Sequence, residues 1–277
     1  MRSNGRATAL SVAATLLVAC ASLAGAGAGA ASAVAAGVPE QASLSAGFSP
    51  DRLGQSTTIS FGFHLQTAEG TAPPPLTGIA LQMPAGMNYT LTTLGLAICQ
   101  PSVLAVQGPK GCPPNSRLGT GNALVEVPFG TGSGHEIPEV QAVVGPPKEG
   151  NMVVLFYANG QTPVFAQLVF TGEVLPDSGI FGSELATSVP LIPSVPNGPD
   201  VSVVRVNATI GPAGLTYYKR SHGRLVPFRP AGIGVPERCP HGGFPFHASF
   251  TFQDGSQASA STTVACPPPV VVHHRRK

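Results

Sequence analysis

Hydrophobic and polar residues alternate along two segments of the chain with the period of two that is typical of a half-buried β-strand. From Thr57 to Leu65, every second residue from Ile59 onward is apolar, and the residues between them are small or polar. From Phe244 to Phe252, four phenylalanines and one alanine alternate with residues that include His247 and Ser249. Successive side chains of a strand point to opposite faces, so each segment has one face suited to a core and one suited to solvent.

Two hairpins are predicted at dipeptides that tolerate a positive φ. Strands at 152–157 and 164–170 flank Asn159-Gly160, and strands at 244–252 and 257–266 flank Asp254-Gly255. Both strands of the first hairpin are apolar on both faces, which predicts a central place in a sheet. Further strand candidates lie at 42–48, 76–83, 122–127, 139–144 and 201–210.

The pattern after the N-terminal region favours strands throughout. No stretch there shows ten residues of helical period free of Pro and Gly, and proline-bearing segments separate the strand candidates. We therefore expect an all-β fold, an antiparallel β-sandwich of Ig-like or jelly-roll-like type. The glycine-rich run 130–134 leaves open two packed sandwiches with a boundary near residues 130–136.

The N-terminus has the pattern of an export signal. Arg2 and Arg6 precede an uncharged run that is rich in Ala, Leu and Val and then in Ala and Gly. The segment Ala31-Ser32-Ala33 fits a cleavage site, so residues 1–36 are predicted to be a signal peptide. The exported all-β region is then 37–267, and 268–277 is a Pro-rich and basic tail. The Ala- and Gly-rich second half disfavours a membrane-spanning anchor.

A second interpretation of the leader depends on Cys20. Leu17-Val18-Ala19-Cys20 resembles a relaxed lipobox, in which the cysteine becomes the lipidated first residue. In this case the protein is attached to the outer face of the membrane as a lipoprotein instead of being secreted as a soluble protein. The downstream cleavage site favours the soluble product.

Charge is scarce and unevenly distributed. Only 10% of the residues are charged, and loss of Arg2 and Arg6 leaves 13 basic and 13 acidic residues. The segment 217–239 nevertheless has a net charge of +4. Such a segment is suited to an anionic cell-wall polymer or a membrane surface, and the alternative is a solvated loop. No nucleic-acid partner is expected. The candidate contact residues are Lys219, Arg220, Arg224, Arg229 and Arg238.

Four cysteines follow the leader, and an even number in an exported protein favours disulfides. Three pairings are possible, and we favour Cys99–Cys112 and Cys239–Cys266. The first closes a short proline-bearing loop, and the second joins the two ends of the last hairpin. No C-x-x-C spacing points to zinc, and no metal site is expected.

No motif for catalysis or for a cofactor stands out. Ser133 and His135 are close in sequence but lie in the glycine-rich run without the strand–turn–helix setting of a nucleophile elbow. Acidic residues are scattered through the middle of the chain, where sequence alone pairs no two of them. His241 and His247 have no third ligand at a useful spacing. We expect no cofactor and no enzyme activity.

Several short motifs are spread over most of the chain. They are the Ala/Gly-rich leader, Phe48-Ser49-Pro50, Met83-Pro84-Ala85-Gly86-Met87, Cys112-Pro113 followed by Gly119-Thr120-Gly121-Asn122-Ala123, and Asp254-Gly255-Ser256 before Cys266. In these motifs the chain resembles a class of exported β-proteins of high-GC Gram-positive bacteria that brings no assigned activity. The leading hypothesis is a non-catalytic secreted or cell-envelope protein used for binding or surface structure. The alternative is a cell-envelope hydrolase whose site is assembled from scattered residues.

Overall fold

The structure is a computed structural model that describes residues 41–68, 71–89, 97–211, 216–228 and 233–267. The predicted signal peptide 1–36 with Cys20, the candidate contact residue Arg229 and the tail 268–277 lie outside the described residues.

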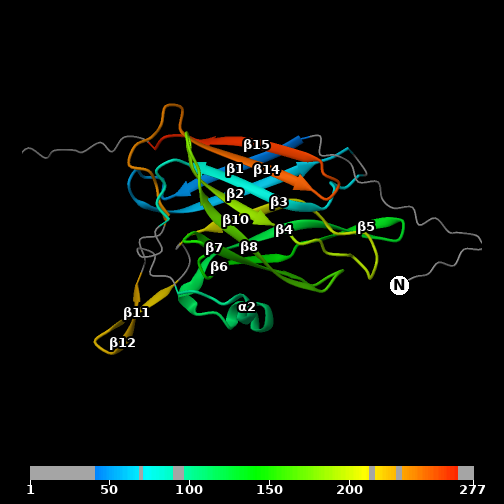
Figure 1. Ribbon diagram of the computed structural model, residues 1–277, viewed down its shortest axis with the longest axis horizontal. Coiled ribbons are helices and arrows are strands. Elements are labelled where there is room, and N and C mark those ends of the chain that lie inside the picture. Colours follow the sequence, from blue (N-terminus) through cyan, green and yellow to red (C-terminus); the bar gives the residue numbers. More distant parts are fainter. Residues whose placement is uncertain (1–40, 69–70, 90–96, 212–215, 229–232, 268–277) are drawn as a thin grey trace, which may run out of the picture. The chain divides into compact units, whose positions relative to one another are not determined.

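Strands form most of the described chain, as Figure 1 shows. Every segment proposed as a strand overlaps a strand, although the strand predicted at 164–170 begins at Ala166 and the one predicted at 257–266 ends at Val264. The strands are β1 (Gln41–Ser49), β2 (Ser56–Gln66), β3 (Leu76–Pro84), β4 (Arg117–Phe129), β5 (Gly132–Glu136), β6 (Glu139–Val144), β7 (Met152–Gly160), β8 (Ala166–Pro176), β9 (Phe181–Ser188), β10 (Ser202–Ile210), β11 (Tyr217–Ser221), β12 (Arg224–Phe228), β13 (Ile233–Gly234), β14 (Phe244–Phe252) and β15 (Gln257–Val264).

The strands pair antiparallel in the order β1-β2-β10-β4-β6-β7-β8-β9-β3-β14-β15, with β13 added to β2 and β5 added to β4. The first and last strands of this path, β1 and β15, lie against each other, so the sheet is a nearly closed, barrel-like arrangement. The predicted all-β, antiparallel, sandwich-like fold is confirmed. Residues 130–136 form the turn and the second strand of the β4–β5 hairpin, and strands from both sides of this segment belong to the same sheet.

The main core lies between β1 and β2 on one side and β3 and β14 on the other. The alternating apolar faces predicted from the sequence meet here, and the rings of Phe63 and Phe250 are 4.8 Å apart. All four phenylalanines of β14 are at most 2% exposed. Burying an aromatic side chain of this kind contributes about 1.5–3 kcal/mol.

The two predicted hairpins are present, but one turn lies elsewhere than predicted. The Asp254-Gly255 turn joins β14 to β15, with Gly255 at φ 83°. In contrast, β7 continues through Asn159-Gly160, and the turn to β8 follows it. The buried carboxylate of Glu136 accepts hydrogen bonds from the backbone N–H groups of Gln161 and Thr162, which fixes the loop there.

One short helix, α2 (Pro101–Gln107), interrupts the strands. Proline suits its first turn, and Gly108 ends it at φ 63°. Leu104 is fully buried and packs the helix onto the face of β7. Two 3₁₀ turns follow, η1 (Gly108–Lys110) and η2 (Pro114–Ser116).

Candidate functional site

The basic residues predicted as a contact site are concentrated on a separate two-stranded hairpin, β11–β12. Tyr217 pairs with Phe228 at its base and Ser221 with Arg224 at its tip. The turn consists of His222 and Gly223, at φ 49° and 78°, as a tight hairpin turn requires. Figure 1 shows this hairpin extending away from the strands of the main sheet.

The base of the hairpin is fixed to the main sheet by hydrogen bonds. The Tyr217 hydroxyl, in a side chain 1% exposed, donates to the Arg117 carbonyl oxygen at 2.6 Å. Burial raises the pKa of Tyr217 to about 12. The Asn115 side chain donates to the Tyr218 carbonyl at 2.5 Å and accepts from the Tyr218 N–H at 2.8 Å. The hairpin therefore has a fixed base and an exposed tip.

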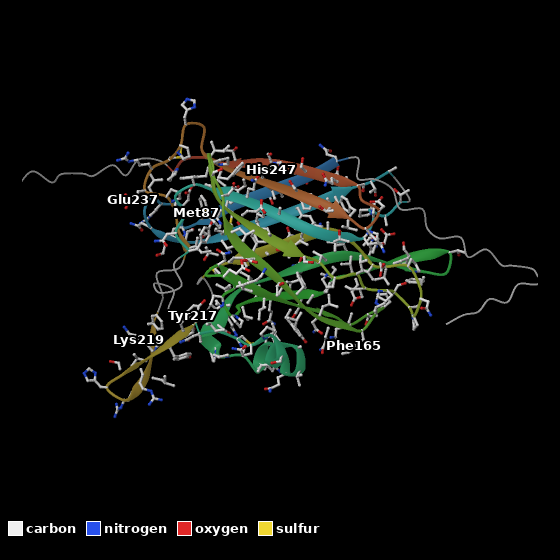
Figure 2. All side chains as sticks on the ribbon, in the orientation of Figure 1. Met87, Phe165, Tyr217, Lys219, Glu237 and His247 are labelled. Carbon is white, nitrogen blue, oxygen red and sulfur yellow. A yellow bond between two sulfur atoms is a disulfide. The ribbon has the colours of Figure 1, made fainter. Side chains whose placement is uncertain are left out.

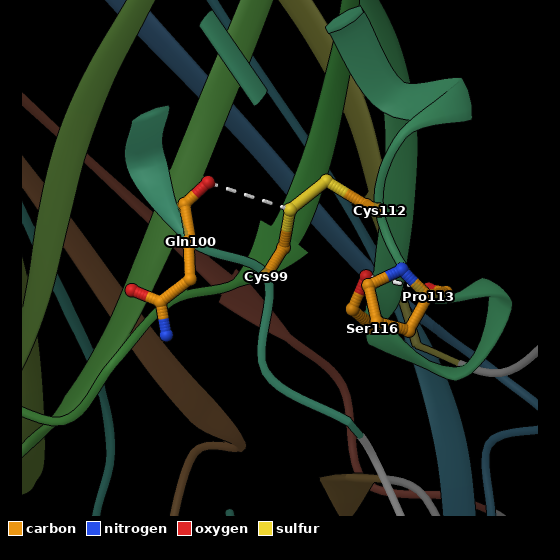
Figure 3. Close-up of a disulfide and its surroundings, with 5 residues drawn as sticks. All are labelled: Cys99, Gln100, Cys112, Pro113 and Ser116. Carbon is orange, nitrogen blue, oxygen red and sulfur yellow. Dashed lines mark hydrogen bonds between the residues drawn. A yellow bond between two sulfur atoms is a disulfide. The ribbon is translucent and has the colours of Figure 1, made fainter. Parts of the chain in front are cut away.

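A disulfide stabilises the segment that holds this base. Cys99 and Cys112 are bonded and almost fully buried, and they bracket α2 (Figure 3). Just beyond Cys112, the Ser116 hydroxyl donates to the Pro113 carbonyl at 2.7 Å within η2. Asn115 lies in this turn. The disulfide thus links α2 to η2, and Asn115 of η2 holds the base of the hairpin.

The second disulfide, Cys239–Cys266, joins the segment before β14 to the end of β15. Both pairings are those that the sequence favours. Two disulfides are typical of a protein in a non-reducing compartment.

Three cations lie on the hairpin, with Lys219 and Arg224 on one face and Arg220 on the other. Lys219, Arg220 and Arg224 are exposed. The described residues contain a single ion pair, Lys148–Glu173, so none of the three is neutralised by a carboxylate in this structure. The Lys219 Nζ atom lies 5.7 Å from the centre of the Phe228 ring, within the range of a cation–π contact.

The five predicted contact residues are only partly brought together. Arg238 lies beside Cys239 in the other disulfide-linked segment, and its neighbour Glu237 is well separated from Lys219 in Figure 2. With Arg229 outside the described residues, the site that the structure supports consists of Lys219, Arg220 and Arg224.

Sequence reasoning missed the apolar part of this site. Leu225 is 66% exposed and Tyr218 is 42% exposed. Leu225 lies directly opposite Arg220 across the hairpin, so the two side chains share one face with Tyr218. The only signal was a pair of short segments, 217–221 and 224–228, on either side of His222-Gly223, and both are too short to stand out from a loop.

The structure places the hydrolase candidates without assembling a triad. The Ser133 hydroxyl donates to Glu126 rather than to a histidine. His247 contacts Ser261 at 2.8 Å and Ser249 at 3.3 Å, one on each ring nitrogen. Both ring nitrogens of His247 are thus in contact with serines, and neither is available for the carboxylate that orients the histidine of a catalytic triad. His247 lies on the outward face of β14, because Phe246 and Ala248 beside it are buried.

Within the described ranges, no group of three or more His, Cys, Asp or Glu side chains is arranged to hold a metal ion. The same part of the chain has no helix that is long and apolar enough to cross a membrane. No family model, curated protein sequence or solved structure matches the chain.

Proposed function

We propose that this is an exported, non-catalytic binding protein whose β11–β12 hairpin contacts an anionic membrane surface of the cell envelope. The observation that carries the proposal is the combination of three unpaired cations with the exposed Leu225 on a hairpin whose base is fixed. Cations alone would suit any anionic polymer. An exposed leucine on the same face as Arg220 favours a lipid surface, since it gains free energy only where acyl chains are within reach.

The expected binding energy follows from these side chains. Each Lys or Arg near an anionic membrane surface contributes about 1 kcal/mol, so three cations contribute about 3 kcal/mol. Transfer of a largely exposed leucine into the interface adds about 1–2 kcal/mol. The result is weak, reversible and salt-sensitive binding.

Export is part of the proposal and is supported by two independent features. The two disulfides suit a non-reducing compartment. The leader has a basic start, an apolar run and small residues at a cleavage site. If Cys20 is lipidated, the lipid anchor and the hairpin both attach the protein to the membrane.

Vesicle co-sedimentation tests the hairpin. We expect the protein to bind vesicles of anionic phosphatidylglycerol and not of phosphatidylcholine. Binding should be lost when salt is raised from 0.1 to 1 M, since the Debye length falls from about 10 to about 3 Å. Arg220→Gln and Arg224→Gln should each lower the binding constant about fivefold. Arg205→Gln, an exposed arginine on β10, is the matched control.

Leu225→Ser distinguishes a membrane from a polymer. It should weaken vesicle binding about tenfold, whereas Ile180→Ser, at a residue 67% exposed, should not change it. Binding to soluble polyphosphate that survives Leu225→Ser, together with no vesicle binding, would replace the membrane by an anionic wall polymer. Vesicle binding unaffected by all three hairpin substitutions would refute the site.

A further inference from the structure

An apolar cavity of about 50 Å³ lies between the two sides of the main sheet. Its lining comes from strands far apart in the sequence, and apart from the Tyr89 hydroxyl the lining side chains carry only carbon and sulfur. Several of them, including Phe61, Val174 and Leu185, face inward and yet are only half-buried. The two sides of the sheet therefore do not pack fully against each other here. Other lining residues are Leu81, Met83, Met152 and Phe156.

Two hydroxyl groups lie at one end of this cavity without strong partners. The Tyr89 hydroxyl is 3.1 Å from Met83 Sδ and 3.3 Å from Met87 Sδ, and thioether sulfur is a weak acceptor. Burial raises the pKa of Tyr89 above its usual range, and the nearby Ser183 hydroxyl opposes this rise only in part.

Ser183 is the second group. It is 6% exposed, and its Oγ forms no hydrogen bond of normal geometry. It precedes Leu185 by two positions on β9 and lies opposite Met83 in register, so it shares the inward face of these cavity residues. An unsatisfied buried hydroxyl costs about 1–3 kcal/mol. Beyond the weak contacts of Tyr89 with Ser183 and the two sulfur atoms, the pair can offer hydrogen bonds to a ligand.

We propose that this cavity binds an unbranched alkyl chain that ends in a neutral oxygen, a primary alcohol being the simplest case. The Tyr89 O–H donates to that oxygen, and Ser183 accepts or donates beside it. Among the residues that the structure describes, no Lys or Arg lines the cavity, so a carboxylate would be desolvated there without a counter-charge from them. The ligand class is thus a fatty alcohol rather than a fatty acid.

The size of the cavity and the type of its lining agree with a slender chain. An engineered apolar cavity of about 150 Å³ accepts benzene, so this cavity, at about 50 Å³, holds only part of a chain until its lining moves. Met83 and Met152 are unbranched and have three rotatable side-chain bonds each. Such side chains adapt their conformation to a ligand more readily than the branched residues around them. Their movement lets a chain longer than the present cavity enter.

Methyl NMR of methionine-labelled protein tests the proposal with 1-octanol as the probe. We expect saturable shifts of the Met83, Met87 and Met152 methyl signals, and binding of octanoate at least tenfold weaker. Tyr89→Phe should weaken 1-octanol binding between about twofold and tenfold, as loss of one hydrogen bond predicts. Tyr218→Phe, on the exposed hairpin, is the matched control.

A cavity-filling variant completes the test. Val174→Phe should abolish the octanol-dependent shifts while vesicle binding through the hairpin remains, so the two proposals fail or stand separately. If Val174→Phe does not fold, Val174→Leu with Tyr89→Phe replaces it. Methionine signals that do not move up to the solubility limit of 1-octanol would overturn the cavity assignment. Octanoate binding as tight as that of octanol would overturn the neutral end group.

Discussion

Removing each disulfide separately tests whether burial or loop length determines its contribution to stability. Cys99 and Cys112 are 13 positions apart, and Cys239 and Cys266 are 27 apart. Loop-closure entropy then assigns about 2.9 kcal/mol to the first disulfide and about 3.6 kcal/mol to the second. Loop length alone predicts that the second is the more important.

Burial reverses this order. Cys99 is 0% exposed and Cys112 is 6% exposed, and both pack with Leu104 of α2. Replacing two buried sulfur atoms by the hydrogens of alanine adds about 0.5–1.5 kcal/mol each, by analogy with other small core deletions. Cys266 is exposed and Cys239 half-buried, so little is added there. We expect removal of the first disulfide to lower the free energy of unfolding by about 4–6 kcal/mol, and removal of the second to lower it by about 3.6 kcal/mol.

The measurement is urea unfolding of the two double-alanine variants at pH 7 with linear extrapolation. A larger loss for Cys239→Ala with Cys266→Ala than for Cys99→Ala with Cys112→Ala would refute the argument from burial. The first variant has a further expected effect, because η2 holds Asn115 against the hairpin. It should also weaken vesicle binding, which the second variant should leave unchanged.

Three further predictions concern single residues. Tyr217→Phe should destabilise the fold by about 1 kcal/mol through loss of the hydrogen bond to the Arg117 carbonyl. Because the pKa of Tyr217 is raised to about 12, an unfolded tyrosine ionises from pH 10 upward while the folded one stays neutral. The free energy of unfolding of the wild type should thus fall between pH 10 and 12 more steeply than that of the variant, and equal slopes would contradict this. Gly121→Ala should cost about 1–3 kcal/mol in chemical denaturation, since its Cβ would lie within 2.4 Å of a backbone oxygen of β10. Gly132→Ala, with open space around the added methyl, should change stability by less than about 0.5 kcal/mol. Glu136→Ala should cost about 1–3 kcal/mol by leaving two backbone N–H groups of the β7–β8 loop without their acceptor, and an unchanged urea midpoint would show that water replaces the carboxylate.

The strands with strict alternation could be predicted from sequence, because one face of each is buried along its whole length, as in β2 and β14. The helix α2 was missed because seven residues between Pro101 and Gly108 carry no complete helical period. The strands β11 and β12 were also missed because they are too short to show a period, although their charged residues were noticed.

The arrangement of the strands was beyond sequence reasoning. β2 pairs with β10, about 140 positions later in the chain, and nothing local encodes that choice. The cavity shows the same limit, since Tyr89 and Ser183 approach each other only through the fold. The anchor at Asn115 is an ordinary polar residue in sequence, and only its two hydrogen bonds to Tyr218 reveal its role.

The contact between the first strand and the last determines when folding can be completed. β14 supplies four phenylalanines to the main core, and β15 closes the path against β1. Neither exists until nearly the whole chain has been synthesised. Pairings of such long sequence separation also form slowly. If the chain is exported unfolded, in line with the proposed function, this topology delays the core until the C-terminal strands have arrived.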